Sequence, residues 1–278
     1  MEKASKLSFF SKLKIIIENN KAKCILHGVL KAHTIFCLII TLSAGNWLCF
    51  GYSVITLLLF LLPTLVQIGF KIELPLSLEA VIMLFIWAAM VLGDVYDWYV
   101  VFEHWDTFLH TITGFVAAAV GVGLINLMNR DDKCALKLSP LFVAVFCFSF
   151  SMMIGAMWEL FEFCIDLSGA TNMQKDTLLP SLKFATEGLD GPVSGFVTNI
   201  SEMQFVMDDG TVVAPGIIGY LDMGLIDSIE DMFVNFIGAL IFGVIAFLYV
   251  KKGGKSKVLN SFTEIKRFDP LRFIKNKE

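Results

Sequence analysis

Long stretches without a formal charge constrain the fold of this chain more than any other feature. No Asp, Glu, Lys or Arg occurs in residues 34–70 or in residues 138–158. A helix needs about 20 apolar residues to cross the hydrocarbon core of a bilayer, and backbone polar groups in lipid must be paired within the segment. The first stretch is therefore long enough for two helical crossings, with Gly45-Asn46 as the turn between them.

Composition places the chain among membrane proteins. Of its 278 residues, 56% are hydrophobic and 17% are charged, whereas about a quarter of the residues in a soluble domain are charged. We therefore expect an all-α polytopic integral membrane protein, a bundle of about six transmembrane helices. Pro63 is expected to kink the second span because proline lacks a backbone N–H. The expected spans are residues 28–45, 48–70, 76–98, 106–128, 138–158 and 229–250.

The distribution of Lys and Arg predicts the orientation in the membrane. Basic residues crowd both ends of the chain and the 129–137 loop, whereas the 96–105 connection has none. In the 169–226 loop, acids outnumber the two lysines. Cytoplasmic loops carry an excess of Lys and Arg, so both termini are expected in the cytoplasm and the 169–226 loop outside. Beside membrane spans such clusters indicate membrane lipids as partners, and no nucleic acid is expected.

Three segments follow from this pattern. The transmembrane domain is expected to include the outer loop 169–226 as a small irregular cap. Near the cytoplasmic interface we expect His27 and His33. In the loop, Asp208-Asp209-Gly210 lies between two short apolar runs, which is typical of a β-hairpin. The segments are a cytoplasmic part at residues 1–27 with an amphipathic helix at 8–18, a transmembrane domain at 28–250, and a basic cytoplasmic tail at 251–278.

Acidic residues gather at the outer ends of the last four expected spans. Within each helix they are three or four residues apart, a spacing that places them on one face. Such polar faces turn toward the interior of a bundle because lipid cannot satisfy them. We therefore expect one cavity at the outer membrane face. Its expected lining residues are Asp106, His110, Glu159, Glu162, Asp227 and Asp231, with Asp94 and Asn235 as second choices.

These side chains favour a divalent cation. Carboxylates, imidazole and amide oxygens suit hard or borderline ions such as Mg, Mn, Zn or Ca. Acids at the start of a helix also suit the helix dipole, so Asp227 has a second interpretation as a helix cap. Clustered carboxylates can also share protons, and a proton relay stays open. The expected roles are metal ligands for Asp106, His110, Asp227 and Asp231, and general bases for Glu159 and Glu162.

Three function classes remain after this reasoning. A metal-dependent enzyme acting on a lipid or lipid-linked envelope substrate is favoured, because transporter sites lie nearer the membrane midplane. The lack of charged residues deeper in the last three spans favours it as well. A cation- or proton-coupled transporter is the alternative. A non-catalytic membrane scaffold or an immunity or resistance factor needs no such site.

Three sequence motifs carry a resemblance to a bacterial family. They are Trp105-Asp106-Thr107-Phe108-Leu109-His110-Thr111, then Trp158-Glu159-Leu160-Phe161-Glu162-Phe163, then Asp227-Ser228-Ile229-Glu230-Asp231-Met232 with Asn235. In these motifs the chain resembles the YjdF-like inner-membrane proteins, an uncharacterised family. More remotely it resembles VanZ-like proteins, although Thr107 stands where those carry a basic residue. The resemblance implies a six-helix protein of the bacterial cell membrane, associated with the envelope.

Overall fold

Six membrane-length helices make up most of this chain in a computed structural model that describes residues 21–129, 138–169, 171–188, 191–213 and 216–267. Within these residues, the six helices have the length and apolar composition of membrane spans. The expected all-α polytopic fold is confirmed, while the amphipathic helix expected at 8–18 lies outside the described residues. The spans are Lys21–Ser43, Trp47–Phe70, Leu76–Val95, Trp105–Met128, Pro140–Asp166 and Leu225–Lys251.

The chain forms two compact units, residues 1–154 with 234–278 and residues 155–233. Two long helices, α9 (Pro140–Asp166) and α10 (Leu225–Lys251), pass without a break from one unit into the other. The remaining helices of the first unit are α3 (Lys21–Ser43), α4 (Trp47–Leu59), α5 (Leu62–Phe70), α6 (Leu76–Trp87), the π-helix η1 (Ala88–Val95), α7 (Trp98–Val101), α8 (Trp105–Met128) and α11 (Lys257–Thr263).

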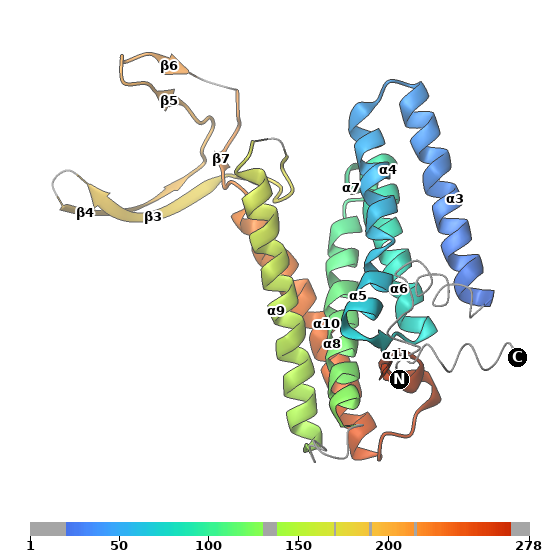
Figure 1. Cartoon of the computed structure of the whole chain (residues 1–278). Coiled ribbons are helices and arrows are strands. Elements are labelled where there is room, and N and C mark those ends of the chain that lie inside the picture. The colour runs from blue at the N-terminus through green and yellow to red at the C-terminus, as the bar shows by residue number, and fades with distance from the viewer. Residues whose placement is uncertain (1–20, 130–137, 170, 189–190, 214–215, 268–278) are drawn as a thin grey trace, which may run out of the picture. The chain divides into compact units, whose positions relative to one another are not determined.

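The first two spans form a helical hairpin that the sequence predicts closely. α3 and α4 lie side by side and are joined by a turn at Gly45, whose φ of 70° favours glycine (Figure 1). The Asn46 side chain then caps α4 by accepting a hydrogen bond from the Cys49 N–H at 3.1 Å. The expected break at Pro63 is confirmed, because α4 ends at Leu59 and α5 begins at Leu62.

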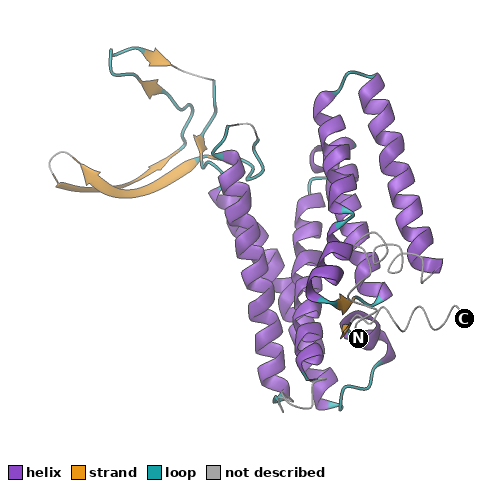
Figure 2. Cartoon of the chain, in the orientation of Figure 1, coloured by secondary structure: helices purple, strands orange, loops and turns teal. Residues whose placement is uncertain are grey.

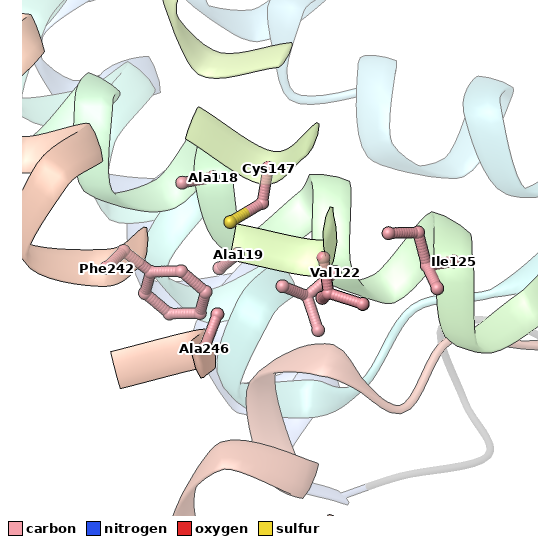
Figure 3. Close-up of a cluster of buried hydrophobic side chains, with 8 residues drawn as sticks. Ala118, Ala119, Val122, Ile125, Cys147, Phe242 and Ala246 are labelled. Atoms are coloured by element: carbon pink, nitrogen blue, oxygen red, sulfur yellow. The ribbon is translucent and has the colours of Figure 1, made fainter. Parts of the chain in front are cut away.

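Small residues bring α8 and α10 into direct backbone contact within the first unit. A Cβ added to Gly114 would lie 2.1 Å from the Asn235 carbonyl oxygen. A Cβ added to Gly238 would lie 2.1 Å from the Thr111 carbonyl oxygen. Next to this contact, Phe242 and Cys147 pack against alanines 118 and 119 and Val122 of α8 (Figure 3). Only glycine permits this approach, a pattern familiar from packed membrane helices.

The chain returns to the first unit after its last span. Residues 257–263 form α11, and the two-residue strand β8 (Lys266–Arg267) pairs antiparallel with β1 (Ile72–Glu73). Ile265, between α11 and β8, is buried and would contact a Cβ placed on Gly123 of α8. Part of the segment expected as a basic tail therefore packs against α6, α8 and β1.

The second unit carries β-structure between α9 and α10 (Figure 2). The expected hairpin is present, with β5 (Phe205–Val206) paired to β6 (Val212–Val213). A longer hairpin, β3 (Ser181–Gly188) with β4 (Gly191–Thr198), was not predicted. The base of the loop is closed by β2 (Leu178–Leu179) pairing with β7 (Tyr220–Leu221).

Candidate functional site

Asp106 and His110 form a pair on the first turns of α8. The helix begins at Trp105, so Asp106 lies in its first turn, where a carboxylate is favoured by the helix dipole. Their i, i+4 spacing brings Asp106 Oδ1 to 3.6 Å from His110 Nε2. His110 is only 8% exposed, and Asp106 is half-buried. The separation exceeds a normal hydrogen bond, so the two groups are placed as neighbours rather than as a bonded pair.

Asp231 of α10 completes a group of three possible ligands. α10 packs on α8 at Gly114 and Asn235, and Asp231 lies one turn before Asn235 on the same uninterrupted helix. One oxygen of Asp106, one imidazole nitrogen of His110 and one oxygen of Asp231 lie within 4.8 Å of one another. Three of the four predicted metal ligands therefore form an Asp/His/Asp cluster.

Asn235 is held at the helix contact by its amide. Its Nδ2 donates to the Ser151 carbonyl oxygen at 3.5 Å, and the Ser151 hydroxyl donates to the Gly114 carbonyl oxygen at 2.7 Å. The Asn235 side chain is 1% exposed, and its Oδ1 has no hydrogen-bond partner among the described residues. A buried amide oxygen without a donor is costly, because it has lost its hydration without a replacement.

Asp94 lies on η1, where the third span changes from α-helix to π-helix. Its carboxylate interacts electrostatically with Asp97 and Asp106. The turn that follows is tight, because the Tyr99 ring packs where a Cβ on Gly93 would stand. Isolated π-helical turns often occur at functional sites because they redirect side chains. Asp94, a second choice among the expected lining residues of the cavity, thus lies within electrostatic reach of the Asp106 side chain.

Glu159, Glu162 and Asp227, like Asp231, belong to the second unit. Glu159 and Glu162 are both buried near the end of α9, and the Trp158 indole N–H donates to Glu162 Oε1 at 2.7 Å. Asp227, in the first turn of α10, accepts a hydrogen bond from the Lys175 backbone N–H at 3.1 Å. This contact ties the loop after α9 to the start of α10. The roles of these residues as bases and ligand stay predictions.

Asp222, which was not among the predicted site residues, also holds this loop at the start of α10. Its carboxylate accepts hydrogen bonds from the Thr177 and Ile226 backbone N–H groups, each at 2.7 Å. Desolvation raises the pKa of Asp222, but donors from Ile226, Thr177 and Gly224 outweigh it, so the pKa lies below its ordinary value. Asp222 stands three residues before the first residue of α10, and its carboxylate accepts an N–H of the first helical turn. An acid just before a predicted helix is the signal that could have identified it.

A second buried polar cluster, also missed, lies at the start of α3 and α6. Lys23 Nζ is 2.6 Å from Glu79 Oε2, and His27 Nε2 is 2.9 Å from Glu79 Oε1. Gln67 Nε2 donates to the same carboxylate at 3.2 Å. Glu79 is 1% exposed and His27 2%, so both are buried within the protein. The expected depth of His27 near the cytoplasmic interface stays a prediction.

Comparison with known proteins identifies the family. A family profile described as "predicted membrane protein" (DUF2238) matches residues 22–252. No curated protein and no solved structure matches the chain. The matched region contains the Asp/His/Asp cluster and nearly all of the six membrane-length helices. The chain therefore belongs to the DUF2238 family of predicted membrane proteins.

Proposed function

We propose that this protein is a divalent-metal-dependent enzyme of the bacterial cell membrane that acts on a lipid or lipid-linked envelope substrate. The observation that carries the proposal is the grouping of Asp106, His110 and Asp231 ligand atoms within 4.8 Å. One imidazole and two carboxylates are a suitable donor set for Mn, Zn or Mg. Three protein ligands leave positions for water and substrate, as catalytic metal sites do.

The spacing of the ligands supports a shared ion. Two ligands that are each about 2.1 Å from one ion lie roughly 3 to 3.5 Å apart. The 3.6 Å between Asp106 Oδ1 and His110 Nε2 is close to that separation. Asn235 adds a fourth candidate, because its buried Oδ1 lacks a donor and lies one turn from Asp231. Amide oxygens are common ligands of hard cations.

The proposed chemistry assigns different roles to the two groups of acids. An ion at the Asp/His/Asp cluster would polarise a phosphoryl or carbonyl oxygen and lower the pKa of bound water. Glu159 or Glu162 would then accept the proton of the attacking water. Trp158 orients Glu162 by its 2.7 Å hydrogen bond.

The proposed orientation puts this chemistry outside the cytoplasm. With both termini cytoplasmic, the start of α8 and the 169–226 loop face outward. The remote VanZ-like resemblance, which implies an association with the cell envelope, supports that side for the proposed substrate. The support for this orientation is the bias of Lys and Arg toward the termini and the 129–137 loop.

Transport is the second candidate, and a specific observation favours it. The last three spans lack deeper charged residues, which disfavours a transporter, but the first and third spans differ from them. Lys23, His27 and Glu79 form a buried charged cluster between the first and third spans. Ionisable residues buried among membrane helices often mark ion or proton pathways. A cation-coupled transporter would use such a cluster together with the Asp/His/Asp group.

Metal binding by purified protein tests the proposal. In detergent solution, Mn, Zn, Mg or Ca should raise the unfolding temperature, because an ion that binds the folded state stabilises it by about 2.7 kcal/mol at 100 times its dissociation constant. Asp231→Asn should abolish the rise. Asp208→Asn changes an exposed acid in the β5–β6 turn and should leave it intact. Lack of stabilisation by all four ions would contradict the metal site.

The choice between enzyme and transporter needs a second measurement on the same variants. If the protein is an enzyme, proteoliposomes with the wild-type protein should take up metal ions no faster than proteoliposomes with the Glu79→Gln variant. Uptake that depends on both Asp231 and Glu79 would reject the enzyme and favour transport. Turnover of a lipid-linked phosphate ester that is lost in Glu159→Gln would support the enzyme.

A further inference from the structure

Two adjoining cavities lie where the second and fourth spans end. The first has a volume of about 440 Å³ and is lined only by apolar side chains, among them Pro63, Val66, Val120 and Leu124. The second, of about 390 Å³, shares Phe70, Ile72 and Leu127 with the first and adds Lys71, Met128 and Arg267. The second cavity is lined by two basic side chains, and neither cavity is lined by an acidic one. An apolar chamber thus adjoins a basic one.

The polypeptide fixes the basic chamber firmly. Lys71 ends α5 in a left-handed conformation, and its N–H is bonded to the Gln67 carbonyl oxygen. The Gln67 side chain accepts a second hydrogen bond, from the Leu74 N–H to Oε1 at 3.1 Å, and this bond ties the residue after β1 to α5. Arg267 lies opposite Ile72 in the β1–β8 pair, and Ile72 directly follows Lys71 in the chain. Two cations from distant parts of the sequence are thereby held at the rim of one cavity.

The depth of the two chambers matches the layers of a bilayer. The second span ends at Phe70 and the fourth at Met128, so in a bilayer crossed by these spans Lys71 and Arg267 would lie at the level of the lipid phosphates. Pro63 and Val120 line the apolar chamber about two helical turns inside those ends, which would be the depth of acyl chains. Basic pockets between membrane helices bind anionic lipid headgroups in this manner.

We propose that these two cavities form a binding site for an anionic phospholipid. One acyl chain occupies the apolar chamber, and the phosphate lies between Lys71 and Arg267. The site is separate from the proposed metal centre, because Leu127 and Asp106 lie at opposite ends of α8. The lipid is therefore a resident ligand that stabilises the fold at the β1–β8 junction, and not the substrate of that centre.

The test compares two lipids that share their acyl chains. Native mass spectrometry of the full-length protein should show phosphatidylglycerol retained at least about fivefold more than phosphatidylcholine. The double variant Lys71→Gln/Arg267→Gln should lower that ratio to about one. Lys266→Gln is the matched control: Lys266 is the neighbour of Arg267, it pairs with Glu264 at 3.8 Å, and it lines neither cavity. The control should keep the wild-type ratio.

Two further measurements separate the lipid from other occupants. Leu124→Trp fills the apolar chamber and should reduce retention of both lipids severalfold, with the protein still monodisperse and folded by circular dichroism. Inorganic phosphate alone should not reproduce the thermal stabilisation given by phosphatidylglycerol. Equal retention of the two lipids by the wild type would overturn the proposal. Equal thermal stabilisation by inorganic phosphate and by phosphatidylglycerol would overturn it as well. A variant that lacks residues 268–278 adds a third check: lipid retention by that variant alone, and not by the full-length protein, would also overturn it.

Discussion

At the scale of single residues, the two polar clusters differ in how visible they are in a sequence. Asp106 and His110 stand out because a helical spacing of four unites two ligand types in an apolar run. Lys23 instead belongs to a run of N-terminal lysines, and Glu79 is an isolated acid at the start of a span. Their pairing depends on how α3 and α6 pack. The sequence therefore indicates the candidate metal site, whereas the Lys23–Glu79 pair needs the three-dimensional structure.

The Lys23–Glu79 pair predicts a large effect on stability. Glu79→Ala should lower the free energy of unfolding by about 3–5 kcal/mol, because it leaves the buried Lys23 charge without a partner. Lys23→Met/Glu79→Leu should recover most of the loss, because it removes both charges. Glu264→Gln breaks a half-exposed pair with Lys266 and should cost about 1 kcal/mol or less. Denaturant unfolding of the variants in detergent measures these differences, and a Glu79→Ala loss as small as that of Glu264→Gln contradicts the prediction.

At the scale of helices and strands, the sequence predicts those breaks and turns that depend on a few neighbouring residues. Pro63 predicts the break between α4 and α5, and Asp-Asp-Gly at 208–210 predicts the shorter hairpin. The β3–β4 hairpin was missed although Asp190-Gly191 is itself a hairpin signal, because glycine and proline interrupt the alternation of its second strand. The two-residue β1–β8 pair has no local pattern, since its strands are joined only by tertiary packing.

The contact between α8 and α10 predicts a sharp difference among glycines. Gly114→Ala should destabilise the protein by about 1–3 kcal/mol or more, because its Cβ would lie 2.1 Å from the Asn235 carbonyl oxygen. A Cβ on Gly51 meets nothing within 4 Å, so Gly51→Ala should be neutral or stabilise α4 by up to about 1 kcal/mol. Unfolding temperatures of the two variants in the same detergent check this. Equal behaviour of the two would mean that the close contact is not needed.

At the scale of the whole molecule, the number and order of spans follow from hydropathy, because only helices satisfy their backbone in lipid. The expected second to fourth spans begin within one residue of the observed ones. The first and sixth observed spans begin earlier than expected, and the fifth begins at Pro140, slightly later than expected. The fifth span, α9, extends to Asp166 because amphipathic turns continue a helix past the apolar run. Hydropathy could not indicate that residues 257–267 pack back on the bundle, since that depends on β1 and α8.

The distribution of basic residues predicts the orientation of the whole molecule. Reporter fusions after Asn172 and after Glu278 should give an external and a cytoplasmic signal, respectively, because Lys and Arg retain their loops in the cytoplasm. An alkaline phosphatase and green fluorescent protein pair reads both sides. A cytoplasmic signal at Asn172 would reverse the proposed location of the Asp/His/Asp cluster while leaving the fold unchanged.

The pairing of β1 with β8 has a consequence for biosynthesis. Ile72 and Arg267 are about 200 residues apart, so at 5–20 residues per second roughly 10–40 s separate their synthesis. Until then, β1 lacks its partner strand and the site that buries Ile265 is unfilled, while all six spans enter the membrane. The β1–β8 pair can therefore form only after all six spans have been synthesised. A chain truncated before Ile265 would carry every span and still present an unfinished surface to membrane proteases.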